Sequence, residues 1–125
     1  MPGCVFCTIL AGLEPAGIVR VWADAVALVP VRPVADGHVI VIPRAHVPHA
    51  LADPDAAGLT ARRAAEYAAD ARLAAANLIT SAGAAATQTV YHLHVHVVPR
   101  AEGDGLALPW SAPGRLPLPH SAGRL

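Results

Sequence analysis

The segment HLHVHVVPR, residues 92–100, places a histidine at every second position: His92, His94 and His96. In an extended strand successive side chains point to opposite faces, so these three imidazoles are predicted to share one face. The Val and Leu residues between them favour a strand. Imidazole is mostly neutral at pH 7 yet easily protonated, so such a row suits acid/base work, covalent catalysis or metal binding.

A second chemical signal is the pair Cys4 and Cys7, in a C-x-x-C spacing. In a reducing compartment this spacing indicates metal or redox chemistry more than a structural disulfide. Tetrahedral zinc would need two further ligands from elsewhere in the chain. The alternative is a pair of reduced, buried thiols without a metal.

The composition narrows the class of protein. A chain of 125 residues corresponds to one domain. Its formal net charge of zero argues against nonspecific binding to nucleic acid or to an acidic membrane. Neither a leader peptide pattern nor an apolar stretch of about 20 residues is present, so we expect a soluble, cytoplasmic protein without membrane contact.

The strands and the helix that must position these residues can be predicted from the local sequence pattern. Runs of β-branched residues between turn signals predict strands at 18–22, 25–29, 38–42 and 88–98. Asp53-Pro54 predicts a helix N-terminus, and the Ala-rich sequence that follows favours a helix to about Leu78. The order predicts an α+β fold: an antiparallel sheet with one principal helix. Residues 101–125 form a Pro/Gly-rich tail, which we expect to be irregular or partly disordered.

The histidine run is preceded by Gln88-Thr89-Val90-Tyr91, with Gly37-His38 and Pro43-Arg44-Ala45-His46 further upstream. With these segments the chain resembles the histidine triad (HIT) family from about Cys4 to Arg100, so residues 1–100 are expected to form the HIT domain. The resemblance implies a HIT-like fold whose sheet extends across a homodimer. It also implies a nucleotide substrate, with a purine favoured. The implied reaction is hydrolysis or transfer at the α-phosphate of nucleoside phosphoramidates, dinucleoside polyphosphates or related conjugates.

The resemblance also implies roles for individual residues. His94 matches the nucleophile, which forms a covalent nucleotidyl-histidine intermediate. His96 matches the third triad histidine, at the leaving group, and His92 matches the first, which is more structural. His38 matches a separate histidine that supports the nucleophile. If the strand already begins at Gln88, this amide shares the histidine face and can reach the phosphate or leaving group, although it could instead satisfy backbone groups.

Several positions match substrate contacts of the family. Thr89 occupies a position where a hydroxyl often contacts the leaving group, and it too could instead satisfy backbone groups. Ser81 stands where Asn is common and can still form hydrogen bonds. The apolar residues that match the nucleobase pocket are Phe6, Leu28 and Val31, for which plain core packing is the alternative.

Two departures from the family pattern affect substrate recognition. Pro30 stands where many relatives have Asp or Asn that holds the ribose hydroxyls, and proline has no side-chain donor or acceptor. Thr87 stands where Gly is frequent, and its branched side chain restricts a backbone that Gly would leave permissive. The changes at Ser81 and Thr87 alter the phosphate-side loop, and weak or altered nucleotide selectivity is therefore expected.

Relatives with the N-terminal cysteine pair often complete a zinc site with two histidines. By resemblance these ligands are His46 and His92, beside Cys4 and Cys7, with His49 as an alternative. The expected zinc is structural, tying the N-terminal segment to the sheet, and no catalytic metal is expected.

Two other functions remain open on the sequence. The three alternating histidines could jointly hold a catalytic metal, although Gln88, Gly37-His38 and Arg100 have no place in that account. The chain could also be a nucleotide-binding regulator with negligible turnover, because Pro30 and Ser81 depart from the family pattern.

Overall fold

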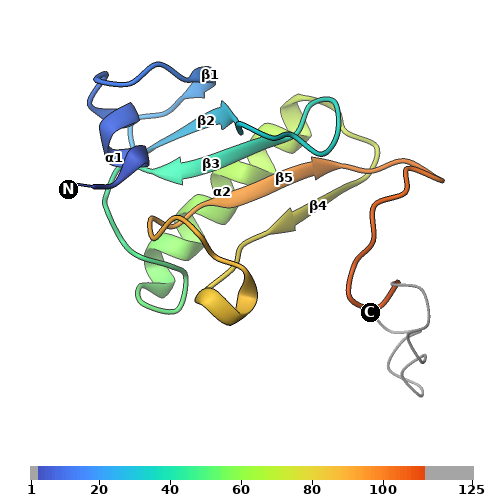
Figure 1. The fold of residues 1–125 in the computed structure, drawn as a ribbon. Helices are drawn as coiled ribbons and strands as arrows, with labels where there is room; N and C mark the ends of the chain where they lie inside the picture. The colour runs from blue at the N-terminus through green and yellow to red at the C-terminus, as the bar shows by residue number, and fades with distance from the viewer. Residues whose placement is uncertain (1–2, 112–125) are drawn as a thin grey trace.

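A five-stranded antiparallel sheet, with strand order β1-β2-β3-β5-β4, forms the centre of the molecule (Figure 1). The computed structural model describes residues 3–111. Its strands are β1 (Gly17–Val21), β2 (Ala25–Val29), β3 (Val39–Pro43), β4 (Ala76–Ile79) and β5 (Val95–Pro99). Its helices are α1 (Val5–Leu10), α2 (Pro54–Asp70) and a 3-10 turn, η1 (Ala84–Ala86). The α+β fold with one principal helix is thus confirmed.

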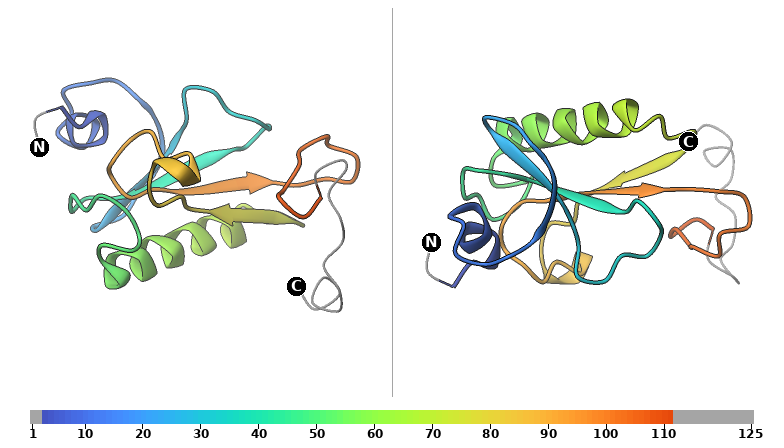
Figure 2. Two further views of the ribbon diagram at one scale, coloured as in Figure 1. Left: turned by 60° about the horizontal axis from the view of Figure 1, so that its bottom comes forward. Right: turned by 90° about the horizontal axis from the view of Figure 1, so that it is seen from above.

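Helix α2 covers one face of the sheet (Figure 2). Asp53 caps its N-terminus by accepting a hydrogen bond from the Ala56 amide, and Pro54 occupies the first turn, as predicted. Ala64 is fully buried against Ala25 and Ala27, so small residues on both partners allow close approach.

The opposite face carries helix α1 (Figure 2). Alternate residues of β2 and β3 point to the two faces, and on this side they join α1 in a second buried cluster. The buried members of that cluster are Cys4, Phe6, Ile9, Val26, Leu28, Ile40 and Ile42. The sheet therefore has an α2 face and an α1 face, and the site lies on the α1 face.

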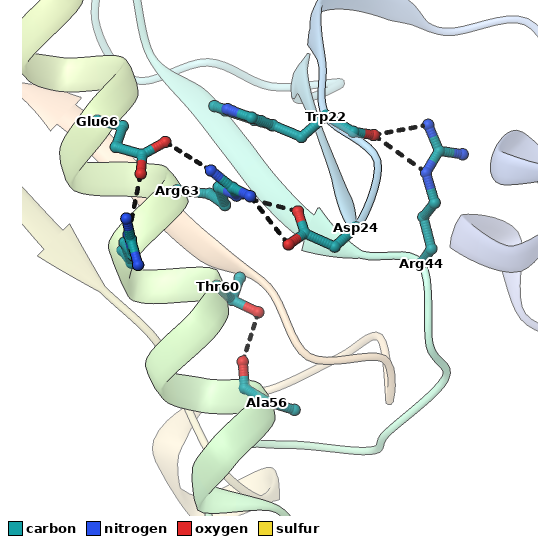
Figure 3. Close-up of polar contacts among 8 residues, drawn as sticks. Trp22, Asp24, Arg44, Ala56, Thr60, Arg63 and Glu66 are labelled. Carbon is teal, nitrogen blue, oxygen red and sulfur yellow. Dashed lines mark hydrogen bonds and ion pairs between the residues drawn. The ribbon is translucent and has the colours of Figure 1, made fainter.

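A polar contact fastens α2 to the turn between β1 and β2 (Figure 3). The Arg63 guanidinium donates two hydrogen bonds of 3.0 Å to the two carboxylate oxygens of Asp24 and one of 2.9 Å to Glu66. This bidentate pair lowers the pKa of the Asp24 carboxyl through the hydrogen bonds from Arg63. The helix is thereby held in register on the sheet.

The predicted end of the long helix is wrong. α2 ends at Asp70, because Arg72 adopts a left-handed conformation (φ 57°) that terminates the helix. Residues 76–78 were predicted as the end of the helix, but residues 76–79 form β4 and pair with β5 from Ala76↔Pro99 to Ile79↔His96. Alanine favours helix locally, but pairing with a distant strand decides the structure here.

The predicted final strand is too long. β5 begins at Val95, so residues 88–94, His92 and His94 included, lie in an irregular segment before the strand. The face shared by three histidines of one strand is therefore not the basis of the site. Helix α1 was not predicted.

Residues 101–111 contain no helix or strand, as expected for the tail, and residues 112–125 lie outside the described part of the chain. In the described part, no helix is both long and apolar enough to cross a bilayer.

Candidate active site and metal centre

Two cysteines and two histidines from three separate segments meet at the N-terminal end of α1. Cys4 is the N-cap of α1 and Cys7 lies in its first turn, His46 follows β3, and His92 precedes β5. Their ligand atoms all lie within 4.8 Å of one another. The four residues predicted as zinc ligands are thus brought together, whereas His49 is outside the group.

The distances in this cluster suit a tetrahedral zinc ion. Zn–N and Zn–S bonds of ordinary length place two nitrogens about 3.3 Å apart and a nitrogen and a sulfur about 3.6 Å apart. Nδ1 of His46 and Nδ1 of His92 are 3.2 Å apart. The sulfur atoms lie 3.3 Å (Cys7 to His46), 3.4 Å (Cys4 to His92) and 3.6 Å (Cys7 to His92) from these nitrogens.

The protonation of His92 also suits a metal ligand. Its Nε2–H donates to the carbonyl oxygen of Pro43 at 2.8 Å, which leaves the lone pair on Nδ1, inside the cluster. Burial lowers the pKa of His92, so the ring is neutral at pH 7, as coordination requires. The residues present therefore fit a closed Cys2His2 site.

The imidazole of His94 is oriented by the backbone of His92. Its Nδ1–H donates to the carbonyl oxygen of His92 at 2.8 Å. The neutral ring then has its lone pair on Nε2. A histidine held in this tautomer offers one nucleophilic nitrogen to a substrate.

A chain of hydrogen bonds fixes the tautomers of His38 and His96. The Val34 amide donates to Nδ1 of His38 at 3.0 Å, so the proton of neutral His38 is on Nε2. That Nε2–H faces Nδ1 of His96 at 2.9 Å. His96 accepts there, and its own N–H is on Nε2. His38 was predicted to support the nucleophile, and in the structure its side chain contacts His96.

Burial keeps this pair neutral. Desolvation lowers the pKa of His38 and, with the nearby charges of His94 and His38 as smaller causes, lowers the pKa of His96 to about 4. At pH 7 His96 is therefore an uncharged hydrogen-bond donor.

His94 and His96 line a cavity of about 570 Å³ on the α1 face. Six predicted substrate contacts line it: Phe6, Leu28, Val31, Thr89, His94 and His96. Leu28, Ile40 and His96 are neighbours on consecutive strands, so the cavity runs across the sheet from apolar residues to imidazoles. A larger hollow of about 850 Å³ beside residues 100–107 includes none of the predicted site residues.

The sequence analysis missed some residues that line this cavity, among them Ile40, Val90, Glu14 and Arg32. Ile40 was detectable, because it lies two residues after His38 and so on the same strand face. The others lie on irregular segments, where periodicity gives no signal.

Gln88 and Ser81 are not among the residues that line the cavity. The Gln88 side chain is buried: its oxygen accepts from the Gly83 amide at 2.8 Å, and its nitrogen donates to the carbonyls of Pro48 (2.7 Å) and Val90 (3.0 Å). Since the strand does not begin at Gln88, the argument that placed its amide on the histidine face is wrong. In the structure this amide links two loops.

The three triad histidines do not form one set of metal ligands. Nδ1 of His92 faces the cysteines and its Nε2 is bonded to Pro43. Within residues 3–111, the metal-type cluster that contains a triad histidine is the Cys2His2 group.

The fold and its histidine motif define an α+β protein of the histidine triad type. The family model described as "HIT domain" matches residues 14–103, and the chain belongs to the HIT family. It is 40% identical over 115 residues to an uncharacterized HIT-like protein of Mycobacterium tuberculosis, covering 84% of this chain and 76% of that protein.

Two further relatives bear on the site. An adenosine 5′-monophosphoramidase of Saccharomyces cerevisiae is 32% identical over 111 residues, covering 87% of this chain and 70% of that protein. The crystal structure of a Zn-bound histidine triad family protein from Mycobacterium smegmatis superposes with a TM-score of 0.71 at 33% identity, covering 98% of this chain and 89% of that one.

Proposed function

We propose that this protein is a nucleotide hydrolase or nucleotidyl transferase that acts at the α-phosphate through a covalent intermediate on His94. Its substrates are nucleoside phosphoramidates, dinucleoside polyphosphates or related nucleotide conjugates. The observation that carries the proposal is the bond from Nδ1 of His94 to the His92 carbonyl, which leaves Nε2 as the nucleophilic nitrogen beside the cavity. The phosphoramidase name of the yeast relative supports the same reaction class.

In the first step the Nε2 lone pair of His94 attacks the α-phosphorus. A nitrogen–phosphorus bond forms, and the bond from phosphorus to the leaving group breaks, so the leaving group departs with that electron pair and takes up a proton from solvent, which the second step returns to solvent. In the second step water attacks the same phosphorus and releases a proton. The nitrogen–phosphorus bond breaks, giving the nucleoside monophosphate and regenerating His94; a transferase uses another acceptor instead of water.

His96 and His38 serve both steps as a neutral pair. The Nε2–H of His96 donates a hydrogen bond to the charge that develops on phosphate or leaving-group oxygens. His38 holds that tautomer by donating to Nδ1 of His96 at 2.9 Å. His38 is thus a positioning residue that acts through His96.

The apolar end of the cavity supplies the site for a planar base, with a purine favoured. Phe6 and Leu28 are buried there, whereas Val31 is 98% exposed at the rim. The depth of this end suits binding by apolar contact, with polar groups at the histidine end to fix orientation.

Zinc held by Cys4, Cys7, His46 and His92 would have four protein ligands, which is the arrangement of a structural site. Cysteine thiolates at such a site suit a reducing compartment, which supports a cytoplasmic location. Extension of the sheet across a homodimer is supported by β4, an edge strand that exposes Leu78 and Ile79.

Mass spectrometry of protein quenched during turnover of adenosine 5′-phosphoramidate tests the mechanism. We expect an added nucleoside monophosphate on His94 in the wild type, no adduct in His94→Gly, and less turnover in His96→Ala. His49→Ala is the matched control, because His49 belongs neither to the cysteine and histidine group nor to the cavity lining. This variant should retain the adduct. An adduct on any other residue would overturn the mechanism.

A second candidate is a nucleotide-binding regulator, favoured by the absence of a polar side chain at Pro30 in the cavity wall. A turnover assay separates the two: nucleotide binding without measurable release of a nucleoside monophosphate would favour the regulator.

A further inference from the structure

His92 takes part in both the metal centre and the nucleophile's geometry. Its ring nitrogen Nδ1 lies 3.4 Å from Sγ of Cys4 and 3.2 Å from Nδ1 of His46. Its backbone carbonyl oxygen accepts the 2.8 Å hydrogen bond from Nδ1 of His94. Any displacement of the His92 residue therefore moves the acceptor that fixes the nucleophile's tautomer.

Phe6 makes a second connection between the two sites. It lies between Cys4 and Cys7 in α1, is 7% exposed, and lines the cavity. Its ring meets His92 edge to face at a centroid distance of 5.7 Å and His94 at 5.2 Å. Such contacts favour one orientation of each imidazole.

Helix α1 depends on its surroundings for its position. It has only six residues, and helices this short are unstable in isolation. Two of the four cluster residues are at its N-terminal end, and they face ligands 39 to 88 positions away in the sequence. A metal bound there would join α1 to the loops that carry His46 and His92, and so hold Phe6 against the nucleophile.

We infer that metal binding at the Cys4/Cys7/His46/His92 cluster positions His94 and the Phe6 wall of the cavity, so that the metal and the nucleotide bind with positive coupling. The inference rests on the proposed function, because it assumes that the cavity binds a nucleotide. By linkage, the factor by which the metal tightens nucleotide binding equals the factor by which the nucleotide tightens metal binding. Couplings of this kind are typically about 5- to 150-fold.

Both affinities can be measured on the full chain with AMP as the probe. Calorimetry compares AMP binding by zinc-loaded and chelator-stripped protein, with circular dichroism verifying the fold of each. Competition with a chromogenic chelator gives zinc affinity with and without saturating AMP. We expect AMP to bind at least about 5-fold more tightly to the loaded form, and zinc affinity to rise with AMP by the same factor.

Nitrogen-15 NMR of histidine-labelled protein reports the tautomer of His94 directly. A purely stabilising effect of the metal would not change this tautomer. We expect His94 to be a single Nδ1–H tautomer in the loaded protein and a mixture in the stripped protein. An identical His94 signal in both forms would overturn the positioning role of His92.

Phe6→Leu and Ile9→Val form a matched pair on α1. Both residues line the cavity, but of the two it is Phe6 that contacts the rings of His92 and His94. We expect Phe6→Leu to retain zinc and to lose most of the coupling. Ile9→Val should weaken AMP binding by the same factor in loaded and stripped protein. If the stripped protein unfolds, the comparison uses the zinc affinities of the two variants with and without AMP.

The outcomes separate this inference from the proposed function. Equal AMP affinity in folded loaded and stripped protein would overturn the inference and leave the function intact. Failure of both forms to bind AMP would overturn the proposed function and the inference with it. Tighter AMP binding by the loaded form, together with a matching gain in zinc affinity, would support the inference, whereas weaker AMP binding by the loaded form would overturn it.

Discussion

Nε2 of His38 lies 2.9 Å from Nδ1 of His96, and the Val34 amide occupies the other nitrogen of His38. Because a backbone N–H cannot change its role, it determines the tautomer of both rings. The N–H of His96 is then on Nε2, the nitrogen left for the substrate. A loop amide thus sets the hydrogen-bonding character of His96, two residues after the proposed nucleophile His94.

Removal of His38 is predicted to lower kcat more than it changes KM. In His38→Ala, Nδ1 of His96 loses its donor and the ring can adopt the other tautomer, which presents a lone pair to the developing negative charge. We expect kcat to fall about 10- to 100-fold. His38→Gln, whose amide can both accept from Val34 and donate to His96, should recover part of the loss. Steady-state kinetics that show wild-type kcat for His38→Ala would contradict this role.

The neutral state of His96 predicts loss of stability in acid. Its pKa is lowered from 6.5 to about 4 by burial, so below pH 6.5 the unfolded chain binds a proton that the folded chain does not. Stability is therefore complete above pH 6.5 and is lost as pH falls toward 4. From this shift, and allowing for partial exposure, the loss at pH 4 is about 2–3 kcal/mol.

His96→Asn removes this titration and supplies the comparison. The unfolding free energy of both proteins is measured with urea from pH 7 to pH 4. Over this range the wild type should lose about 2–3 kcal/mol more than the variant. Titrating groups that do not contact His96, including the metal ligands, act in both proteins and so cancel in the difference. A difference that stays constant across this range would show that His96 titrates normally in the folded protein.

The sequence predicted the residues of the site better than their geometry. Cys4, Cys7, His46 and His92 were predictable as a set by family resemblance, and the structure brings them together. The row of histidines was predicted as one strand face, yet β5 begins only at Val95. Each ring is oriented by its own acceptor or donor, and such individual hydrogen bonds leave no periodic signal in the sequence.

The fold, too, was predicted correctly in some elements and wrongly in others. Strands β1, β2 and β3 were predictable within one residue at each end, because β-branched residues alternate between turn signals. The Ala-rich segment 71–79 carries helix propensity but becomes a turn and an edge strand through pairing with β5. Local preference cannot reveal a partner that lies about 20 residues further along the chain.

Thr87 is predicted to be a strained position. It has φ 71° and ψ 20°, a left-handed conformation that is costly for a β-branched residue. Thr87→Gly removes that strain but increases the freedom of the unfolded chain, so we expect a net gain of about 1 kcal/mol, or about 4 °C in Tm. Ala86→Gly, at the adjacent 3-10 position, should instead lose stability. A thermal melt in which Thr87→Gly is less stable than wild type would contradict the assignment of strain.

Pro30 is predicted to weaken discrimination between ribose and its deoxy analogues. It lines the cavity beside His94 and His96 but has no side-chain donor or acceptor. The wild type should therefore turn over adenosine and 2′,3′-dideoxyadenosine phosphoramidates with similar kcat/KM. In Pro30→Asp a carboxylate can accept from ribose hydroxyls, and a charged hydrogen bond corresponds to a preference for the intact ribose of about 10- to 100-fold.

Pro30→Ala separates this effect from the loss of the proline ring. Alanine also lacks a hydrogen-bonding group, so its selectivity should stay close to that of the wild type even if turnover changes. A strong preference of the wild type for the intact ribose would show that another group recognises the sugar. Arg32 is then the residue to examine, because it lines the same cavity as Pro30 and its guanidinium is a hydrogen-bond donor for hydroxyl oxygens.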